Sequence, residues 1–359
     1  MRLGALVTVV LLVAACGAPG GTAGPSTGPT AGTPAVPTAT ATPGLTIVSP
    51  SPASALPTPI ASGPTAMAGL IAYVLGGQGA HEMHVVAPDG TGDRPCGVGS
   101  APSWSADGGT IVVAGPASMT ADGYEFPDVY RAAADCTGAT MLIKEATTPH
   151  LSPDGAWITF GRGIVDTGDA WIAKADGSGP RKLMAATSPT WSPDGSWLLL
   201  NPDTGAFELG LVRPAGTGYH SLGFGSDPAW TSDGRIVYVR SDSPAATVTL
   251  RVTAVDGTAT DLLTIPGEIR SPQMLSDGRV VFVWNGDLWR LDPGSTGPFR
   301  LTQGLTIVAG PSASSDGRWA AVADGGAEPG LVVVSIDGGW VRVLAGAVSA
   351  VAWQPVRPT

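Results

Sequence analysis

The chain has 359 residues, of which 51 are glycine and 33 are proline, and only 13% are charged. The 29 acidic residues outnumber the 19 basic ones, so the net charge is −10, and nucleic acid or anionic lipid headgroups are not expected as electrostatic partners. No uninterrupted apolar stretch reaches the roughly 18 residues of a membrane-spanning helix, which excludes a polytopic helical membrane protein. Frequent turn residues together with Val, Thr and Trp favour short strands, so the composition predicts an all-β fold.

Residues 1–15 have the pattern of a lipoprotein signal peptide. Arg2 supplies a positive start, residues 3–15 are apolar but too short to span a bilayer, and Cys16 directly follows Val-Ala-Ala. This ending resembles the lipobox of bacterial lipoproteins. The resemblance implies cleavage before Cys16, lipidation of its thiol, and an extracytoplasmic protein anchored to the bacterial cell membrane by its acyl chains. The alternative is an ordinary secretory signal followed by a cysteine by chance.

Residues 16–66 form the second predicted region, a lipidated cysteine and a linker. Residues 17–66 contain no Asp, Glu, Lys or Arg and are rich in Pro, Gly, Thr and Ala. Such a segment cannot bury a core, and we expect a disordered tether that lifts the rest of the chain off the membrane. Thr and Ser beside Pro are also typical of O-glycosylated stalks, and an unmodified spacer is the alternative.

Residues 67–359 form the third predicted region and carry a repeat. Six segments follow the pattern P-x-x-S/T-x-D-G without gaps, except that one has Leu275 at the hydroxyl position. Their aspartates are 39 to 47 residues apart: Asp107, Asp154, Asp194, Asp233, Asp277 and Asp316. Periods of this size indicate propellers, solenoids or arrays. An Asp-Gly pair closes a hairpin because Asp accepts backbone N–H groups and Gly takes positive φ, so we predict a structural role for these aspartates.

Each Asp-Gly pair is followed by three apolar runs separated by turns, which gives four strands per repeat, as in a propeller blade. At the start of the repeat region, residues 69–74 have the pattern of a second strand with no first strand before them. Residues 350–355 have the pattern of a first strand with nothing after it. Joining the two ends completes a seventh blade and leaves no terminal sheet edge unpaired. The prediction is a seven-bladed β-propeller, with a six-bladed one as the alternative.

The segment Trp191-Ser192-Pro193-Asp194-Gly195, with its weaker copies, resembles the TolB-like, WD-repeat-like propeller repeat, which also occurs in prolyl oligopeptidase-type propellers. The resemblance covers about residues 67 to 356 and implies the propeller fold without implying one activity. In TolB a six-bladed propeller follows an α/β domain, whereas here an anchor and a tether precede the repeats. The tryptophans of the repeat are expected to pack between blades: Trp104, Trp191, Trp230 and Trp353.

The sequence contains no convincing catalytic motif. The G-x-S-x-G match at residues 24–28 lies in the tether, where it has no structural context. His81 and His84 stand three apart in a segment expected to be a strand, so their side chains point to opposite faces and do not form a zinc motif. We therefore predict that the protein is not an enzyme and needs no cofactor, apart from the Ca²⁺ considered next.

The loop between the second and third strands of a blade should open on the face opposite the Asp-Gly turns. In six predicted blades it carries acidic residues, which are our candidates for a binding face: Asp122, Glu125, Asp128, Asp166, Asp169, Asp203, Asp242, Asp287, Asp324 and Glu328. A ring of carboxylates could attract a basic protein segment or hold Ca²⁺ through oxygen ligands. The alternative is that these residues only form turns and keep the surface soluble.

Two smaller sets of residues complete the candidates. Residues that follow the repeat proline on the innermost strand are small or polar and are expected to line a central channel: Ser103, His150, Thr190, Gln273 and Ser312. Cys96 and Cys136 lie on outer positions of adjacent predicted blades, in an oxidising compartment, and could form a disulfide. Two unpaired cysteines are the alternative.

These features predict a lipid-anchored, monomeric binding or scaffold protein that uses one propeller face to bind a protein or peptide of the cell envelope. One alternative is a hydrolase or lyase that uses the channel mouth and a divalent cation. Another is a carbohydrate- or cell-wall-binding module, which exposed aromatics at Tyr124, Phe126 and Tyr130 would support.

Overall fold

The computed structural model describes residues 68–76, 81–119, 125–164, 167–203, 207–242 and 247–356. All of them belong to one compact unit, Leu45–Thr359. The predicted signal peptide, Cys16 and the charge-free tether lie outside the described residues. Every regular element in the described part of the chain is a β-strand. Among these residues, no helix has the length and apolar character needed to cross a membrane.

The described strands form six hydrogen-bonded sheets, and one sheet contains both ends of the described chain. Its order is β27-β1-β2-β3, with bounds Val348–Trp353, Ile71–Leu75, Glu82–Val86 and Arg94–Val98. Strands β1 and β27 are antiparallel, with Ile71 opposite Trp353 and Tyr73 opposite Val351. The backbone N–H of Gln354 extends this pairing by donating to Leu70 O at 2.8 Å. Strands from the two ends of the described chain therefore share one sheet.

Four other sheets contain four consecutive antiparallel strands each. The first comprises β4 Ser100–Trp104, β5 Thr110–Met119, β6 Glu125–Ala133 and β7 Thr140–Ile143. The second comprises β15 Ser226–Trp230, β16 Ile236–Asp242, β17 Thr247–Thr253 and β18 Ala259–Pro266. The third comprises β19 Ile269–Met274, β20 Val280–Trp284, β21 Asp287–Leu291 and β22 Phe299–Arg300. The fourth comprises β23 Ile307–Ala313, β24 Trp319–Asp324, β25 Gly330–Ser335 and β26 Trp340–Ala345.

The remaining sheet has seven strands because one long strand, β11, belongs to two four-stranded groups. Its members are β8 Thr147–Leu151, β9 Trp157–Ile164, β10 Thr167–Lys174, β11 Arg181–Trp191, β12 Leu198–Pro202, β13 Glu208–Val212 and β14 His220–Phe224. The first half of β11 pairs with β10, from Arg181 to Ala185, and its second half pairs with β12, from Ala186 to Trp191. Strand β11 therefore ends one four-stranded group and begins the next without a break.

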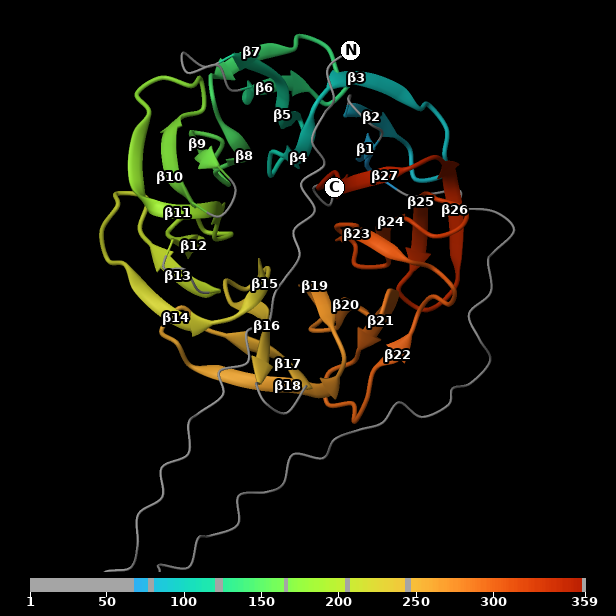
Figure 1. The fold of residues 1–359 in the computed structure, drawn as a ribbon. Helices are drawn as coiled ribbons and strands as arrows, with labels where there is room; N and C mark the ends of the chain where they lie inside the picture. Colours follow the sequence, from blue (N-terminus) through green and yellow to red (C-terminus); the bar gives the residue numbers. More distant parts are fainter. Residues whose placement is uncertain are drawn as a thin grey trace, which may run out of the picture. The chain divides into compact units, whose positions relative to one another are not determined.

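The groups are arranged with their first strands inward. In Figure 1, β4, β8, β15, β19, β23 and β27 surround the centre, and β3, β7, β14, β18, β22 and β26 lie outside. Strand β27, in the sheet that contains both ends of the described chain, contacts β23 on one side and β4 on the other, and β4 in turn contacts β8. The innermost strands are thus neighbours of one another, and residues at the same repeat position lie around a common centre.

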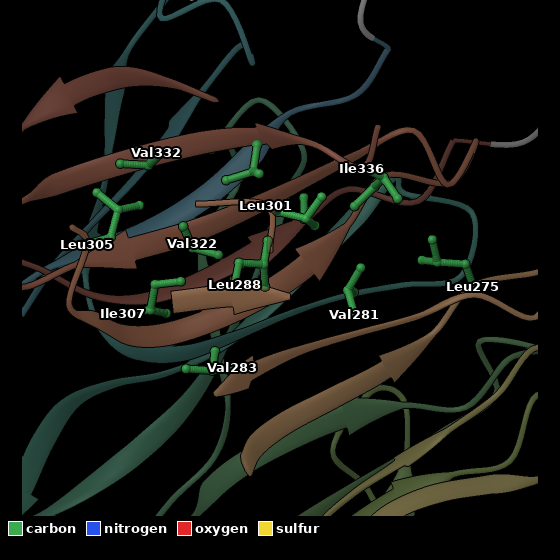
Figure 2. Packing of buried hydrophobic residues seen from close by; sticks show 12 residues of the cluster. Leu275, Val281, Val283, Leu288, Leu301, Leu305, Ile307, Val322, Val332 and Ile336 are labelled. Atoms are coloured by element: carbon green, nitrogen blue, oxygen red, sulfur yellow. The ribbon is translucent and has the colours of Figure 1, made fainter. Parts of the chain in front are cut away.

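The hydrophobic core lies between sheets. Seven clusters occur among the described residues, and each joins two consecutive four-strand groups. In the cluster of Figure 2, Val281 and Leu288 of one sheet pack against Val322 and Val332 of the next. Strands such as β20, with the sequence VVFVW, are buried at every position because both of their faces are covered. The apolar strands of the repeat therefore form the core by packing one sheet against the next.

The Asp-Gly turns have the predicted structural role. The hydroxyl residue of the motif is part of the same hydrogen-bonded turn. Ser192 Oγ donates to Asp194 Oδ1 at 2.6 Å and accepts the backbone N–H of Trp197 at 2.9 Å. Asp194 Oδ1 also accepts the N–H of Ser196 at 3.0 Å, and Gly195 has φ 70°. Ser192 is only 2% exposed, so its hydroxyl satisfies a strand N–H that water does not reach. These bonds lower the pKa of Asp194 to about 2, with the Ser192 hydroxyl as the main cause.

The motif tryptophans pack between neighbouring sheets, as predicted. Their indole N–H groups reach the innermost strand of the preceding group: Trp104 donates to Ala352 O at 3.0 Å, Trp191 to His150 O at 3.1 Å and Trp230 to Thr190 O at 3.2 Å. Trp353 instead donates to Ala68 O at 3.3 Å and packs in the cluster with Ile71 and Ala321. Each of these side chains therefore fills apolar space and also satisfies a backbone carbonyl.

Candidate functional site

A cavity of about 660 Å³ lies between the innermost strands β11 and β15. We call it the β11/β15 cavity. Its lining residues are Thr187, Ser188, Thr190, Leu199, Leu200, Asn201, Pro202, Asp203, Phe207, Gly225, Ser226, Asp227 and Pro228. They come from two consecutive four-strand groups, and the volume is in the range of small-molecule and side-chain binding pockets. Thr190 and Asp203 are predicted site residues that the fold brings into this one cavity.

A backbone irregularity shapes the cavity wall. Ser188 and Asp227 both precede a repeat proline and both have positive φ, 51° and 50° respectively. Their strands lose register at this point, between Thr187 and Thr190 and between Ser226 and Ala229. The same irregularity recurs before each repeat proline, at Ala101, Thr148, Ser188, Asp227, Ser271 and Gly310. Bulges of this kind redirect side chains, and they turn the residue before proline away from the regular sheet ladder.

The cavity is negatively charged. Among the described residues of its lining, Asp203 and Asp227 are the ionisable ones, and none is Lys, Arg or His. Asp227 Oδ1 accepts the backbone N–H of Ser271 at 3.1 Å, which leaves its second oxygen for a ligand. Asp203 is exposed, and its carboxylate makes no hydrogen bond or ion pair within the described residues. A ligand in this cavity would meet carboxylate oxygens without competing cations.

Polar and aromatic groups stand beside these carboxylates. Asn201 also lines the cavity; its Nδ2 donates to Glu208 O at 3.2 Å, and its Oδ1 can accept a hydrogen bond. Phe207 is 80% exposed although it is a large apolar side chain. Neither Phe207 nor Asn201 was expected from the sequence, since neither belongs to the repeat motif. The ring of Phe207 is therefore open to a ligand at the cavity wall.

A second cavity of about 310 Å³ adjoins the first. It shares Asp227 and Pro228 with the β11/β15 cavity and continues along Ser271, Gln273 and Pro311 on β19 and β23. Ser271 also has positive φ, 49°, at the equivalent bulge. Through the shared residues Asp227 and Pro228, the two cavities together are lined by residues of four consecutive strand groups, from the group that begins with the second half of β11 to the group of β23.

Most predicted channel residues tie innermost strands together rather than pointing freely into a channel. Ser103 Oγ and His150 Nδ1 are hydrogen-bonded at 3.0 Å and join β4 to β8. Gln273 Oε1 accepts the N–H of Ala313 at 2.9 Å and joins β19 to β23. Ser312 Oγ accepts the N–H of Trp353 at 2.8 Å and joins β23 to β27. The small polar side chains on the innermost strands thus serve inter-sheet bonding, which the spacing of the repeat could not reveal.

The environment of His150 keeps its imidazole neutral. The ring is partly accessible but closely surrounded by protein, and burial lowers its pKa to about 4. A neutral ring can donate from one nitrogen and accept at the other, which suits its bond to Ser103. At neutral pH His150 is therefore not a cationic group for an acidic ligand.

Three predicted binding-face acids are buried, which corrects the expectation of an exposed acidic ring. Asp128 is 4% exposed and accepts from Ser118 Oγ and from the N–H of Glu145 at 3.0 and 2.9 Å. Asp324 is 2% exposed, accepts the N–H of Thr306 at 2.8 Å and pairs with Arg342. Carboxylates in this setting hold loops to neighbouring strands, because buried N–H groups need acceptors.

Asp287 is the third buried acid. It is 6% exposed, is paired with Arg300 and accepts from Thr302 Oγ1 at 3.0 Å. Arg300 lies on the following strand, β22, and Thr302 comes just after it. The burial of Asp287 therefore depends on partners that the loop pattern alone did not indicate.

The other predicted binding-face acids are dispersed. Glu125 and Glu328 are exposed, and Asp169 pairs with Lys182 with 2.6 Å between Oδ1 and Nζ. Asp122, Asp166 and the side chain of Asp242 lie outside the described residues. No group of three or more His, Cys, Asp or Glu side chains in the described ranges is arranged to hold a metal ion. Of the members of this set that the structure describes, Asp203 alone lines the β11/β15 cavity.

The predicted cysteine pair forms a disulfide between Cys96 and Cys136, whose Cα atoms are 5.0 Å apart. Cys96 lies on the outer strand β3, and Cys136 lies in the turn between β6 and β7. The bond therefore joins two neighbouring sheets at their outer edges. Of the aromatics considered for carbohydrate binding, Phe126 and Tyr130 are half-buried, and Tyr124 is outside the described residues.

No protein-family model matches the sequence, and no curated protein matches it either. Several solved structures are similar in fold. TolB from Acinetobacter baumannii is 16% identical, with a TM-score of 0.52, over 82% of this chain and 68% of that chain. Oligogalacturonate lyase from Vibrio parahaemolyticus is 10% identical, with a TM-score of 0.60, over 75% of this chain and 86% of that chain.

A third similar structure is the dihydro-heme d1 dehydrogenase NirN, which is 14% identical, with a TM-score of 0.54, over 83% of this chain and 79% of that chain. At these identities the likeness concerns the fold alone. It shows that the described part of this chain has a TolB-like β-propeller fold, a fold that both enzymes and non-enzymes use.

Proposed function

We propose that this protein is a lipid-anchored extracytoplasmic binding protein whose β11/β15 cavity receives a segment of a protein or peptide in the cell envelope. The observation that carries the proposal is the cavity itself. It combines two carboxylates, an amide and an exposed phenylalanine, and none of the described lining residues is basic. A peptide segment offers what this lining needs: N–H donors, a positive charge and apolar side chains.

We also propose that the propeller is closed and has seven blades. Hydrogen bonds occur at each junction between innermost strands, including β27 with β4 through Trp104 and β15 with β19 through Asp227. The hydrophobic clusters likewise run from one group to the next and return to the group that contains β1 and β27. Counting β11 twice, as the last strand of one group and the first of another, gives seven blades. A rigid ring would hold the cavity walls, which belong to different groups, at a fixed separation.

The proposed location rests on the sequence. The lipobox-like ending before Cys16 and the charge-free tether would place the propeller outside the cytoplasm, attached to the membrane through acyl chains. The disulfide between Cys96 and Cys136 is consistent with an oxidising compartment. We propose a monomer, since the acidic net charge opposes self-association.

A hydrolytic enzyme is the second candidate, because one observation favours it. Ser103 Oγ lies 3.0 Å from His150 Nδ1, a distance suited to a nucleophile and its base. The low pKa of His150 makes it a weak base at neutral pH, and the described residues place no carboxylate on the other ring nitrogen. The test is the hydrolysis of a generic ester such as p-nitrophenyl acetate. Activity that is lost in His150→Ala but kept in His81→Ala, a substitution of an exposed histidine, would favour this candidate.

Panning a library of random short peptides against the whole chain tests the proposed binding function. We expect enrichment of sequences whose binding is lost in Asp203→Asn and in Phe207→Ala. Glu328→Gln and Phe224→Ala are matched controls, because both residues are exposed and neither lines the cavity. Enriched peptides that bind all four variants equally would contradict a site in the β11/β15 cavity.

A further inference from the structure

We infer that the β11/β15 cavity recognises an arginine side chain of its partner. The inference rests on the proposed function and names the group that the cavity selects. The cavity offers an aromatic ring at Phe207 and acceptor oxygens at Asp203, Asp227 and Asn201. A guanidinium group has five N–H donors in one plane and an apolar face that stacks on aromatic rings.

The chain itself uses this combination elsewhere. The guanidinium carbon of Arg290 lies 5.1 Å from the ring centroid of Phe299, and its Nε lies 2.7 Å from Asp292 Oδ1. Arg300 lies 5.6 Å from the ring centroid of Trp289 and pairs with Asp287. In both places a carboxylate and an aromatic ring hold one guanidinium between adjacent strands.

The β11/β15 cavity is lined by a ring and by carboxylates, and no guanidinium is found among its lining residues in the described part of the chain. Among the described residues, its lining includes no Lys, Arg or His. The exposure of Phe207, 80%, leaves its ring available, whereas Phe299 is half-buried. An arginine from a second molecule would complete the arrangement and would satisfy acceptors that the propeller leaves open.

Hydration and shape both favour arginine over lysine. An ammonium group is a compact and strongly hydrated charge, so it gains less from a ring face and can satisfy fewer acceptors in one plane. A divalent cation prefers several carboxylate ligands at one point, and no group of three His, Cys, Asp or Glu side chains that could hold a metal ion occurs among the described residues. The neighbouring hollow at Ser271, Gln273 and Pro311 gives room for residues that flank the arginine.

The test uses three synthetic peptides with blocked ends, Ac-Ser-Ala-X-Ala-Ser-NH2, in which X is arginine, lysine or citrulline. Citrulline keeps the shape of arginine but is uncharged. We expect the arginine peptide to bind the whole chain at least about fivefold more tightly than the lysine peptide and at least about tenfold more tightly than the citrulline peptide. Titrations followed by NMR or by fluorescence of a labelled peptide give these ratios.

Two variants separate the contributions of the ring and the charge. Phe207→Leu should remove the preference for arginine over lysine. Asp203→Asn should weaken the binding of both the arginine and the lysine peptide. Phe224→Leu and Glu328→Gln should change neither, because these exposed residues do not line the cavity. Circular dichroism of each variant checks that the fold is intact.

Equal affinity for the arginine and citrulline peptides would overturn the inference, and so would failure of all three to bind. The proposed function is judged separately by the panning experiment. Cavity-dependent peptides without arginine would leave the proposed function standing and overturn the arginine assignment. No cavity-dependent peptide at all would remove both.

Discussion

The side chain of Gln354 binds the backbone of Leu70, although 284 residues separate them: Gln354 Oε1 accepts the Leu70 N–H at 2.8 Å. The same amide donates from Nε2 to Gly108 O at 2.7 Å, in the next sheet. One glutamine thus joins the first described strand, the last strand and the Asp-Gly turn of a neighbouring group. These contacts explain how residues at the two ends of the described chain are held together.

Gln354→Ala should lower the free energy of unfolding by about 1–3 kcal/mol, because it leaves a partly buried N–H and a carbonyl without partners. Chemical denaturation of the whole chain measures this loss. Gln303→Ala is the matched control, since Gln303 is exposed and should change stability by less than about 0.5 kcal/mol. Equal effects of the two substitutions would contradict the role of Gln354.

Glycines of equivalent turns should differ in their tolerance of alanine. Gly108 and Gly155 have nearly the same φ, 70° and 69°. A Cβ at Gly108 would lie 2.3 Å from Pro355 O, whereas a Cβ at Gly155 would meet nothing within 4 Å. We expect Gly155→Ala to cost about 1 kcal/mol for its backbone conformation alone.

Gly108→Ala should cost clearly more than Gly155→Ala, because the C-terminal segment must also move. Thermal unfolding of both variants compares them directly. If a further variant that lacks residues 355–359 shows the same difference, the clash with Pro355 is not its cause.

Folding stability should depend on pH through His150. Burial lowers its pKa to about 4 in the folded chain, from 6.5 as the ordinary value. The unfolded chain therefore binds a proton at pH values where the folded chain does not, and stability decreases as pH falls from about 6.5 to about 4. The shift corresponds to at most about 3 kcal/mol.

Urea denaturation at a series of pH values should show this dependence in the wild-type protein and a smaller one in His150→Gln. His81→Gln is the control, because His81 is exposed. A pH profile that is the same in His150→Gln and wild type would show that His150 is not the group responsible.

The disulfide between Cys96 and Cys136 closes a loop of 40 residues. Restriction of the unfolded chain by such a loop stabilises a protein by roughly 3–4 kcal/mol. The double variant Cys96→Ser/Cys136→Ser should therefore melt at a lower temperature than the oxidised wild type. Reductant should lower the melting temperature of the wild type and leave that of the double variant unchanged. A wild-type protein that melts at the same temperature with and without reductant would contradict this account.

Local sequence determined much of the fold. The repeated P-x-x-S/T-x-D-G segment identifies its turns because Asp, Gly and a hydroxyl residue are all needed within seven positions, as the bonds of Ser192 and Asp194 illustrate. The apolar runs that follow predict strands, and the fragments at the two ends predict that β1 and β27 share a sheet. These features depend on residues close in sequence or on a regular period, so a pattern can reveal them.

Only the tertiary structure decided which acids are available. Asp324 and Asp203 occupy similar loops, yet Asp324 is 2% exposed against Arg342 and Asp203 is exposed in a cavity. The difference depends on which N–H groups and arginines neighbouring strands bring near, and that information is spread over distant parts of the chain. The cavity between β11 and β15 is likewise made by two groups of strands, so no single repeat contains its pattern. The exposure of the Phe207 ring at this cavity likewise results from tertiary packing.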